Sequence, residues 1–162
     1  TDDIILCYPA FTAISSYRIA HELYKLNVPT IPRIITERAH KQTGIEIHPG
    51  AEIGRSFFID HGTGVVIGET AIIGNHVTLY QGVTLGAKNF RYDEKGHPVN
   101  IPRHPILGDD VTVYSNTSIL GRVTIGNGAI IGGNIWLTHS VPEHARVLQS
   151  RSRESFSDGA GI

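Results

Sequence analysis

Hydrophobic residues recur at every sixth position along much of this chain. Between residues 107 and 141, a row of large aliphatic residues is accompanied, four positions later, by a second row of smaller ones. The first row is Leu107, Val113, Ile119, Ile125, Ile131 and Leu137, and the second is Val111, Thr117, Val123, Ala129, Ile135 and Val141. A period of six fits neither an amphipathic helix, with about 3.6 residues per turn, nor a strand that alternates with period 2. It is the hexapeptide repeat typical of a parallel β-helix.

In such a fold each hexapeptide supplies one short strand and one corner, so three hexapeptides make a triangular coil of about eighteen residues. The first-row side chain points into the prism, and the second-row side chain fills the space beside it. Gly126, Gly128 and Asn134 suit corners in which the backbone reaches positive φ. Stacked coils then bury apolar surface that a single coil cannot. A β-sandwich with glycine turns would give irregular strand spacing instead.

Residues 2–42 lack the six-residue period and predict two helices. The first helix has Pro9 at a favourable first position, and the second runs from about Pro32 to Gln42, before Gly44 ends it. We expect these helices to cap the end of the β-helix or to pack on another subunit. The expected organisation is a helical segment over 1–44, a β-helix over 45–142 and a polar tail over 143–162.

The period is broken twice. Ile67 follows Ile59 by eight positions instead of six, so two residues are inserted within 60–64. Leu107 follows Leu85 by 22 positions, so sixteen residues must leave the prism in an excursion at about 87–105. Insertions in a repeat fold usually lie on its binding face, and long loops are usually functional. The breaks therefore indicate where the chemistry lies.

Composition and charge exclude several classes of protein. A chain of 162 residues with 40% hydrophobic content is long enough for one domain with a core. A net charge of −1 and a pI near 6.7 predict no binding to nucleic acid or to an anionic membrane. Without an apolar run of membrane-spanning length or a signal peptide, we expect a cytoplasmic protein. The single cysteine, Cys7, lies in an apolar run and is expected to be buried.

Two of the nine histidines, His61 and His104, lie at the breaks in the repeat. Glu46 precedes His61 by fifteen residues, slightly less than one coil, so we expect the two side chains to come within hydrogen-bonding reach. A carboxylate on one imidazole nitrogen leaves the other as a general base for a hydroxyl group. Asp60 could hold an ammonium group, while Arg103 and His104 could hold a carboxylate. These residues suit a zwitterionic amino acid that bears a hydroxyl group.

Several motifs together resemble the serine O-acetyltransferases of the cysteine pathway. They are GIEIHPGAEIG at 44–54, IDHGTGVVIGET at 59–70, QGVTLG at 81–86 and RHP at 103–105. The likeness extends upstream to Tyr17-Arg-Ile-Ala-His and downstream to Gly133-Asn-Ile-Trp-Leu-Thr. The combination of Asp-His with Arg-His-Pro is specific, whereas many acyltransferases and nucleotidyltransferases share the repeat.

The resemblance implies a mainly β protein, a left-handed parallel β-helix of hexapeptide repeats preceded by a short helical segment. It implies a homotrimer, or a dimer of trimers, with each active site between neighbouring subunits. The implied reaction moves the acetyl group of acetyl-CoA to the hydroxyl of L-serine, giving O-acetylserine and CoA, without a metal. This is the first step of cysteine biosynthesis. A further implied partner is O-acetylserine sulfhydrylase, whose active site would receive the C-terminal Ile162.

The resemblance also implies roles for individual residues. His61 is the base that deprotonates serine, Glu46 orients it, and the attack is direct, without an acyl-enzyme. The residues implied to hold serine are Asp60, Arg103 and His104. Main-chain groups near Ala87, Ser115 and Gly133 are implied to face the pantetheine of acetyl-CoA.

Three other interpretations remain open from the sequence. The first is a hexapeptide acetyltransferase for another hydroxyl acceptor such as a sugar, against which Arg103 argues because a sugar has no carboxylate. The second is a metal site of the γ-carbonic-anhydrase type, in which His104, His139 and His144 would meet across a trimer interface. However, His139 follows His104 by 35 residues, not by two coils of eighteen. The third, a purely structural trimer, leaves both breaks in the repeat unexplained.

Overall fold

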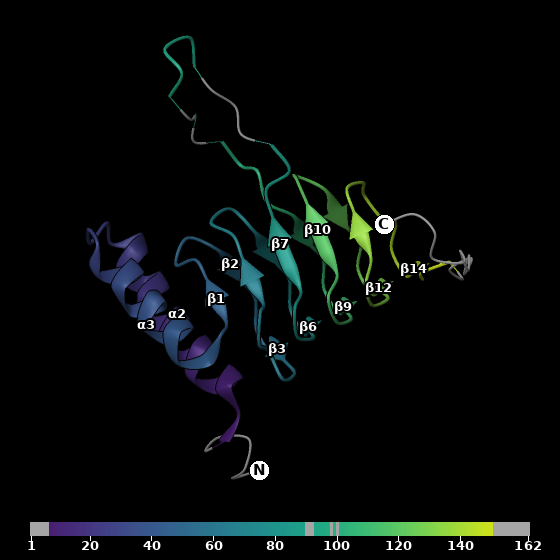
Figure 1. Cartoon of the computed structure of the whole chain (residues 1–162), viewed down its shortest axis with the longest axis horizontal. Helices are drawn as coiled ribbons and strands as arrows, with labels where there is room; N and C mark the ends of the chain where they lie inside the picture. The colour runs from purple at the N-terminus through teal and green to yellow at the C-terminus, as the bar shows by residue number, and fades with distance from the viewer. Residues whose placement is uncertain (1–6, 90–92, 98, 100, 151–162) are drawn as a thin grey trace, which may run out of the picture.

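The computed structural model describes residues 7–89, 93–97, 99 and 101–150. It is a left-handed parallel β-helix with two helices packed at one end, which confirms the predicted fold (Figure 1). The helices are α2 (Pro9–Lys25) and α3 (Ile31–Thr43). The second ends at Gly44, whose φ of 71° is left-handed, as expected for the glycine after a helix.

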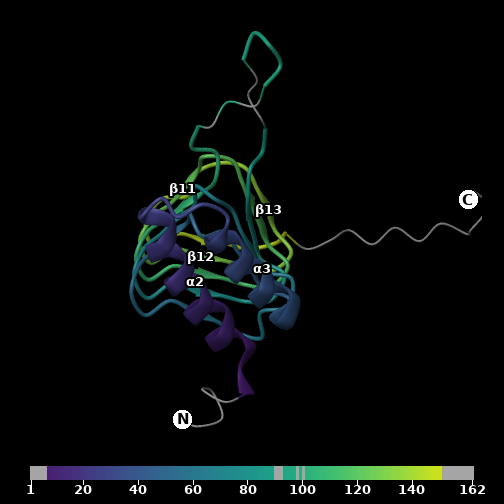
Figure 2. The ribbon, with the colours of Figure 1, turned by 90° about the vertical axis from the view of Figure 1, so that its left-hand side faces the viewer.

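The strands of the described residues form three parallel sheets. Sheet A contains β1 (Glu46–Ile47), β4 (Val66–Ile67), β7 (Thr84–Gly86), β10 (Ser118–Leu120) and β13 (Trp136–Leu137). Sheet B contains β2 (Glu52–Ile53), β5 (Ile72–Ile73), β8 (Ile106–Leu107) and β11 (Thr124–Ile125). Sheet C contains β3 (Phe58–Ile59), β6 (Thr78–Leu79), β9 (Thr112–Val113), β12 (Ile130–Ile131) and β14 (Arg146–Val147). Figure 2 looks from the helical end along the stacked coils.

The strand register confirms both breaks in the repeat. A regular coil spans 18 residues, as from Ser118 to its partner Trp136. From Glu46 to its partner Val66 the coil spans 20 residues, which accounts for the two inserted residues. From Thr84 to its partner Ser118 the span is 34 residues, sixteen more than a regular coil. Those sixteen residues belong to the excursion, whose described residues 93–97 lie far from the body of the prism in Figure 1.

The prism is filled by the two predicted rows of side chains. The inward residue of each strand from β1 to β13 is buried, and Ile59 and Ile119 are completely inaccessible. The second row is buried at Val111, Thr117, Ala129 and Val141, and partly buried at Val123 and Ile135. Burial of this continuous apolar column is the main source of stability, because hydrophobic burial contributes about 25 cal/mol per Å².

The corner glycines have two different roles, of which we anticipated only one. Gly128 and Asn134 have positive φ, as predicted, but Gly126 does not. A Cβ atom on Gly126 would lie 2.4 Å from the backbone nitrogen of Glu143 in the next coil. At that corner glycine is therefore required by the close approach of two coils, not by its conformation.

Helix α2 is fastened to the first coil by three polar side chains. The Tyr17 hydroxyl donates to the carbonyl of Ala51 at 2.5 Å, and burial raises the pKa of Tyr17 to about 12. The Arg18 guanidinium donates to the carbonyls of Ile53 and Gly54. His21 Nδ1 lies 2.8 Å from the carbonyl oxygen of Pro49. The Tyr17-Arg-Ile-Ala-His motif therefore has a structural role at the capped end of the prism.

Two details of the chain differ from the sequence prediction. Strand β14 lies beyond Val141, where we expected the repeat to end, and pairs with β12, so the coil continues to Val147. Cys7 is exposed in the described chain, although we expected it to be buried. Neither helix of the described residues is long and apolar enough to cross a membrane.

Candidate active site

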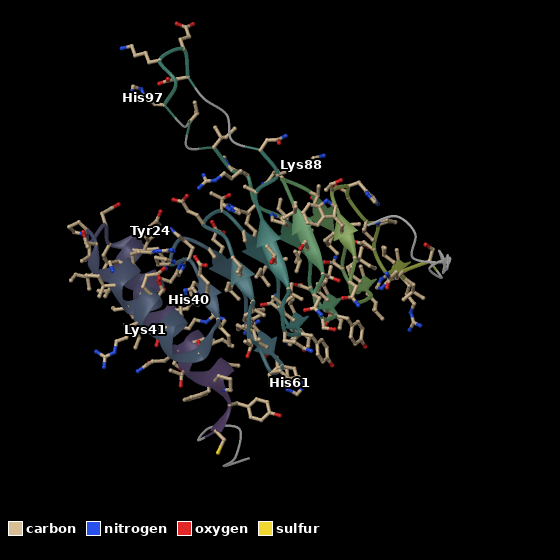
Figure 3. All side chains as sticks on the ribbon, viewed as in Figure 1. Tyr24, His40, Lys41, His61, Lys88 and His97 are labelled. Atoms are coloured by element: carbon tan, nitrogen blue, oxygen red, sulfur yellow. The ribbon has the colours of Figure 1, made fainter. Side chains whose placement is uncertain are left out.

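The candidate residues lie on two edges of sheet A. We call the corner between sheets C and A the C–A edge, formed by residues 60–65, 80–83, 114–117 and 132–135. We call the corner between sheets A and B the A–B edge, formed by residues 48–51, 68–71, 87–89, 101–105, 121–123 and 138–140. Figure 3 shows His61 at the first edge and Lys88, at the base of the excursion, at the second. Within one chain, sheet A separates the two groups.

The C–A edge carries His61 on the inserted corner. The His61 backbone is left-handed, with a φ of 57°, and its side chain is 69% exposed. Asp60 Oδ1 accepts a hydrogen bond from the His61 backbone N–H at 3.0 Å and lies 3.8 Å from Nε2 of the ring. The insertion therefore presents an accessible imidazole with a carboxylate beside it, the combination that a general base requires.

Glu46 does not reach His61 within the chain, which corrects our prediction from the spacing. Its Oε1 atom instead accepts a hydrogen bond from Arg33 at 3.1 Å. The inserted residues lengthen the first coil to 20, so Val66, not His61, is aligned with Glu46. We predicted that fifteen residues make nearly one coil. In the structure His61 lies five residues before Val66, the position aligned with Glu46, and is therefore at the previous corner.

The A–B edge carries Arg103 and His104 at the end of the excursion. Arg103 Nη2 lies 2.8 Å from Glu69 Oε2, and both side chains are mostly buried. Its backbone N–H donates to the Thr70 hydroxyl at 2.9 Å. His104 is buried, with 7% of its surface accessible, and its Nδ1 contacts both the backbone nitrogen and the hydroxyl of Thr70. The two predicted substrate-binding residues are therefore neighbours in a preformed cluster.

The pKa of His104 is lowered to about 4, mainly by burial of the ring and secondly by the positive charge of Arg103. Burial also lowers the pKa of His48, which lies two coils earlier at the same edge. The His48 Nδ1 atom accepts a hydrogen bond from the Gly50 N–H at 3.0 Å. Because both pKa values lie below that of a free imidazole, both rings are neutral at neutral pH. The positive charge that acts on the His104 ring therefore comes from Arg103 and Arg122.

The three positions predicted to face CoA are divided between the edges. Ser115 and Gly133 stack on adjacent coils of the C–A edge, where the Asn134 N–H donates to the Ser115 carbonyl at 2.9 Å. A Cβ atom on Gly133 would lie 3.1 Å from that carbonyl oxygen, so glycine keeps this surface open. Ala87 lies on the A–B edge, at the start of the excursion.

Sequence reasoning assigned no role to Glu69 or Thr70, although both lie within a quoted motif. A usable signal was present in the spacing. Thr70 precedes His104 by 34 residues, which is one regular coil plus the sixteen residues of the excursion. If the sixteen residues of the excursion are subtracted from this spacing, the sequence predicts that the Gly-Glu-Thr corner stacks directly against Arg103 and His104.

The histidines proposed for the alternative metal site do not converge within one chain. His104 and His139 lie on the A–B edge, whereas His144 lies at the corner between sheets B and C. Over the described ranges, no group of three histidine, cysteine, aspartate or glutamate side chains is arranged to hold a metal ion. The geometry of this chain therefore gives no support to that interpretation.

The repeat and its corners place the chain in the class of hexapeptide-repeat proteins. Residues 104–134 match the family described as "Bacterial transferase hexapeptide (six repeats)". A plasmid-encoded serine acetyltransferase of Synechococcus elongatus is 54% identical over 162 residues, covering 99% of this chain and 51% of that protein. The serine acetyltransferase of Bacillus licheniformis is 48% identical over 160 residues, covering 99% of this chain and 70% of that protein. The chain belongs to the serine acetyltransferase family.

Solved structures agree with this assignment. Serine acetyltransferase isoform 3 from Entamoeba histolytica, determined with cysteine, superposes with a TM-score of 0.85 at 40% identity, covering 96% of this chain and 53% of that one. The chain thus spans about half the length of several of the proteins it matches.

Proposed function

We propose that this chain transfers the acetyl group of acetyl-CoA to the hydroxyl of L-serine, giving O-acetylserine and CoA. The observation that carries this proposal is that sheet A has His61, an accessible imidazole, at its C–A edge and has Arg103 and His104 at its A–B edge. Solved relatives at 34% identity support the ligands, since the soybean enzyme was determined with serine and another serine acetyltransferase with CoA. We further propose the first step of cysteine biosynthesis, in the cytoplasm, as its role.

The proposed site is shared between subunits. Within one chain, Asp60 and His61 are separated from Arg103 and His104 by sheet A, so a small substrate cannot contact both edges. A second copy whose A–B edge meets the C–A edge of the first would complete the site. The same docking would bring Ala87 opposite Ser115 and Gly133, on either side of a groove for acetyl-CoA. Because one edge meets a different edge, the contact is heterologous, and a rotation of about 120° between subunits closes such contacts into the homotrimer that we propose.

The proposed chemistry is a direct acyl transfer. His61 removes the proton from the serine hydroxyl as its oxygen attacks the thioester carbonyl. The carbon–sulfur bond then breaks, and the departing thiolate takes the proton from the imidazolium. Asp60 would hold the serine ammonium, while Arg103 and His104 would hold its carboxylate. Glu46, which does not meet His61 within one chain, would act on the imidazole of the neighbouring subunit.

An assay of thiol release tests the proposed reaction. With acetyl-CoA, the protein is expected to release CoA in the presence of L-serine and to form O-acetylserine, identified by mass. Sugars bearing hydroxyl groups serve as the competing acceptors. Turnover of a sugar together with no turnover of L-serine would replace this proposal with the alternative acetyltransferase.

Changing Arg103 to lysine is expected to raise the KM for serine about tenfold and to leave the KM for acetyl-CoA within about twofold. An ammonium group cannot reproduce the planar, bidentate contact of a guanidinium group with a carboxylate. The loss of one charge-assisted hydrogen bond changes affinity by about this factor. Steady-state kinetics with each substrate varied in turn measures both constants. An equal rise in the two KM values would contradict the assignment of Arg103 to serine.

We also propose that the C-terminal Ile162 binds O-acetylserine sulfhydrylase. The position lies outside the described residues, so the support is the sequence, which ends in Gly-Ala-Gly-Ile with one apolar side chain beside the terminal carboxylate. Deleting Ile162 is expected to abolish binding in calorimetry while acetyl transfer continues. Ser157→Ala, a change in the same tail, is the control and should bind normally. Binding that persists without Ile162 would disprove this role.

A further inference from the structure

The His104 ring is held in one tautomer by Thr70. Nδ1 of the ring lies 3.1 Å from the backbone nitrogen of Thr70 and 2.9 Å from its hydroxyl oxygen. A backbone N–H can only donate a hydrogen bond, so Nδ1 must be the unprotonated nitrogen that accepts it. Since the ring is neutral, its single proton is on Nε2. The ring is thus a hydrogen-bond donor on the side away from Thr70.

The Thr70 hydroxyl leads to the same conclusion independently. Its oxygen accepts hydrogen bonds from the backbone N–H groups of Arg103, at 2.9 Å, and His104, at 3.2 Å. A hydroxyl has two acceptor lone pairs and one proton, so with both pairs occupied its proton is directed to the remaining neighbour, His104 Nδ1. One side chain therefore positions the returning end of the excursion and fixes the ring on it.

The surrounding residues make this arrangement rigid. The Arg122 guanidinium donates to the carbonyls of Thr70, at 2.7 Å, and His104, at 3.1 Å, and so ties the two segments together. Gly68 leaves the space that the ring occupies, because a Cβ atom there would lie 2.2 Å from Nε2. The charged or titratable groups around the ring are Arg103, Glu69, His48 and Arg122.

We propose that Thr70 is a positioning residue that fixes His104 as its Nε2–H tautomer, which donates a hydrogen bond to the carboxylate of the substrate. Among the described residues, the structure gives His104 Nε2 no hydrogen-bond partner, so this donor remains for a ligand. The carboxylate as acceptor rests on the proposed function, whereas the tautomer does not. A neutral donor beside Arg103 would also bind the carboxylate without requiring a protonated histidine.

The tautomer can be observed directly in the whole protein labelled with nitrogen-15 at histidine. A two-bond proton–nitrogen correlation spectrum separates protonated from unprotonated ring nitrogens, and the signals missing from a His104→Gln variant identify His104. At neutral pH we expect an unprotonated Nδ1 and a protonated Nε2. A proton on Nδ1, or a cationic ring, would overturn the proposal. This result does not depend on which acceptor the enzyme acetylates, so it stands apart from the test of function.

Two substitutions then connect the tautomer to binding. Thr70→Val keeps the size and the backbone N–H but removes the hydroxyl and its three hydrogen bonds. We expect the KM for serine to rise about tenfold, because Arg103 and His104 are then positioned less well for the carboxylate. The KM for acetyl-CoA should change less than about twofold. The ring-nitrogen signals of His104 should shift, because Nδ1 keeps the backbone donor of residue 70 but loses the hydroxyl donor. Thr70→Ser should restore both properties. Thr78→Val, the same change on a half-buried threonine of sheet C, is the matched control.

Unchanged serine KM and an unchanged ring spectrum in Thr70→Val would overturn the role of the hydroxyl. Failure of Thr70→Ser to recover either property would do the same, because serine supplies the same donor and acceptor. If Thr70→Val does not fold, the wild-type spectrum and Thr70→Ser still decide the proposal. Loss of stability alone would not move the ratio of the two KM values.

Discussion

Changing His61 to alanine is expected to lower kcat by about two to four decades, the contribution of a positioned general base. The effect should be confined to turnover, because the His61 side chain is 69% exposed and lies on an inserted corner outside the packed prism. Thiol release at saturating serine and acetyl-CoA measures it. Circular dichroism and the thermal midpoint should remain close to those of the wild type.

His76 provides a matched control for this experiment. It is also a corner histidine with left-handed backbone, a φ of 55° against 57° for His61, and its side chain is 62% exposed. It lies between sheets B and C, away from the proposed site. His76→Ala should therefore keep wild-type turnover. Near-normal kcat in a folded His61→Ala protein would show that His61 is not the base.

The fold could be predicted from the sequence because the position of a residue in the repeat determines its position in the coil. A side chain at every sixth position must face the axis, and the inserted residues are counted from the interruptions. The register of Glu46 with Val66 and of Thr84 with Ser118 agrees with those counts. Helix ends were also predictable, since Pro9 and Gly44 have strong positional preferences.

The site was less predictable because it depends on which corners become neighbours. The insertion at residues 60–64 both exposes His61 and lengthens the coil, and we counted only the first effect when pairing it with Glu46. The excursion hid the contact of Thr70 with His104 by separating them by 34 residues. The role of Gly126 was missed for a related reason, since close approach of coils depends on stacking and not on local sequence.

The two edges of the proposed site differ in order and in exposure to solvent. The A–B edge is an anion-binding surface whose side chains are already oriented, whereas the C–A edge carries a solvent-exposed base. At the A–B edge, Arg103 is paired with Glu69 and the His104 ring is buried, so their orientations are set before a ligand arrives. At the C–A edge, His61 is exposed, and Asp60 is its polar side-chain partner among the described residues. A second subunit covering this edge would remove water from the imidazole, which strengthens its interactions with a bound substrate.

Mixed trimers of His61→Ala and Arg103→Ala subunits are expected to regain activity that neither variant has alone. In a shared site, His61 comes from one subunit and Arg103 from its neighbour. An Arg103→Ala subunit beside a His61→Ala subunit can therefore form a site with both wild-type residues. For random assembly at equal amounts, about a quarter of all sites should be intact, and about one site in three in the mixed trimers that carry both tags. Co-expression with two different tags, purification through both, and thiol release at low serine measure the recovery.

Mixed trimers of His61→Ala and Asp60→Ala subunits are the matched control. Both residues lie on the same C–A edge, so every shared site receives both from one subunit and lacks one of them. No recovery is expected from this pair. If the site lay within one chain, no combination would recover, and the His61 and Arg103 pair would stay inactive as well. Recovery in the first pair alone would assign the two edges to neighbouring subunits and give the trimer a catalytic reason to form.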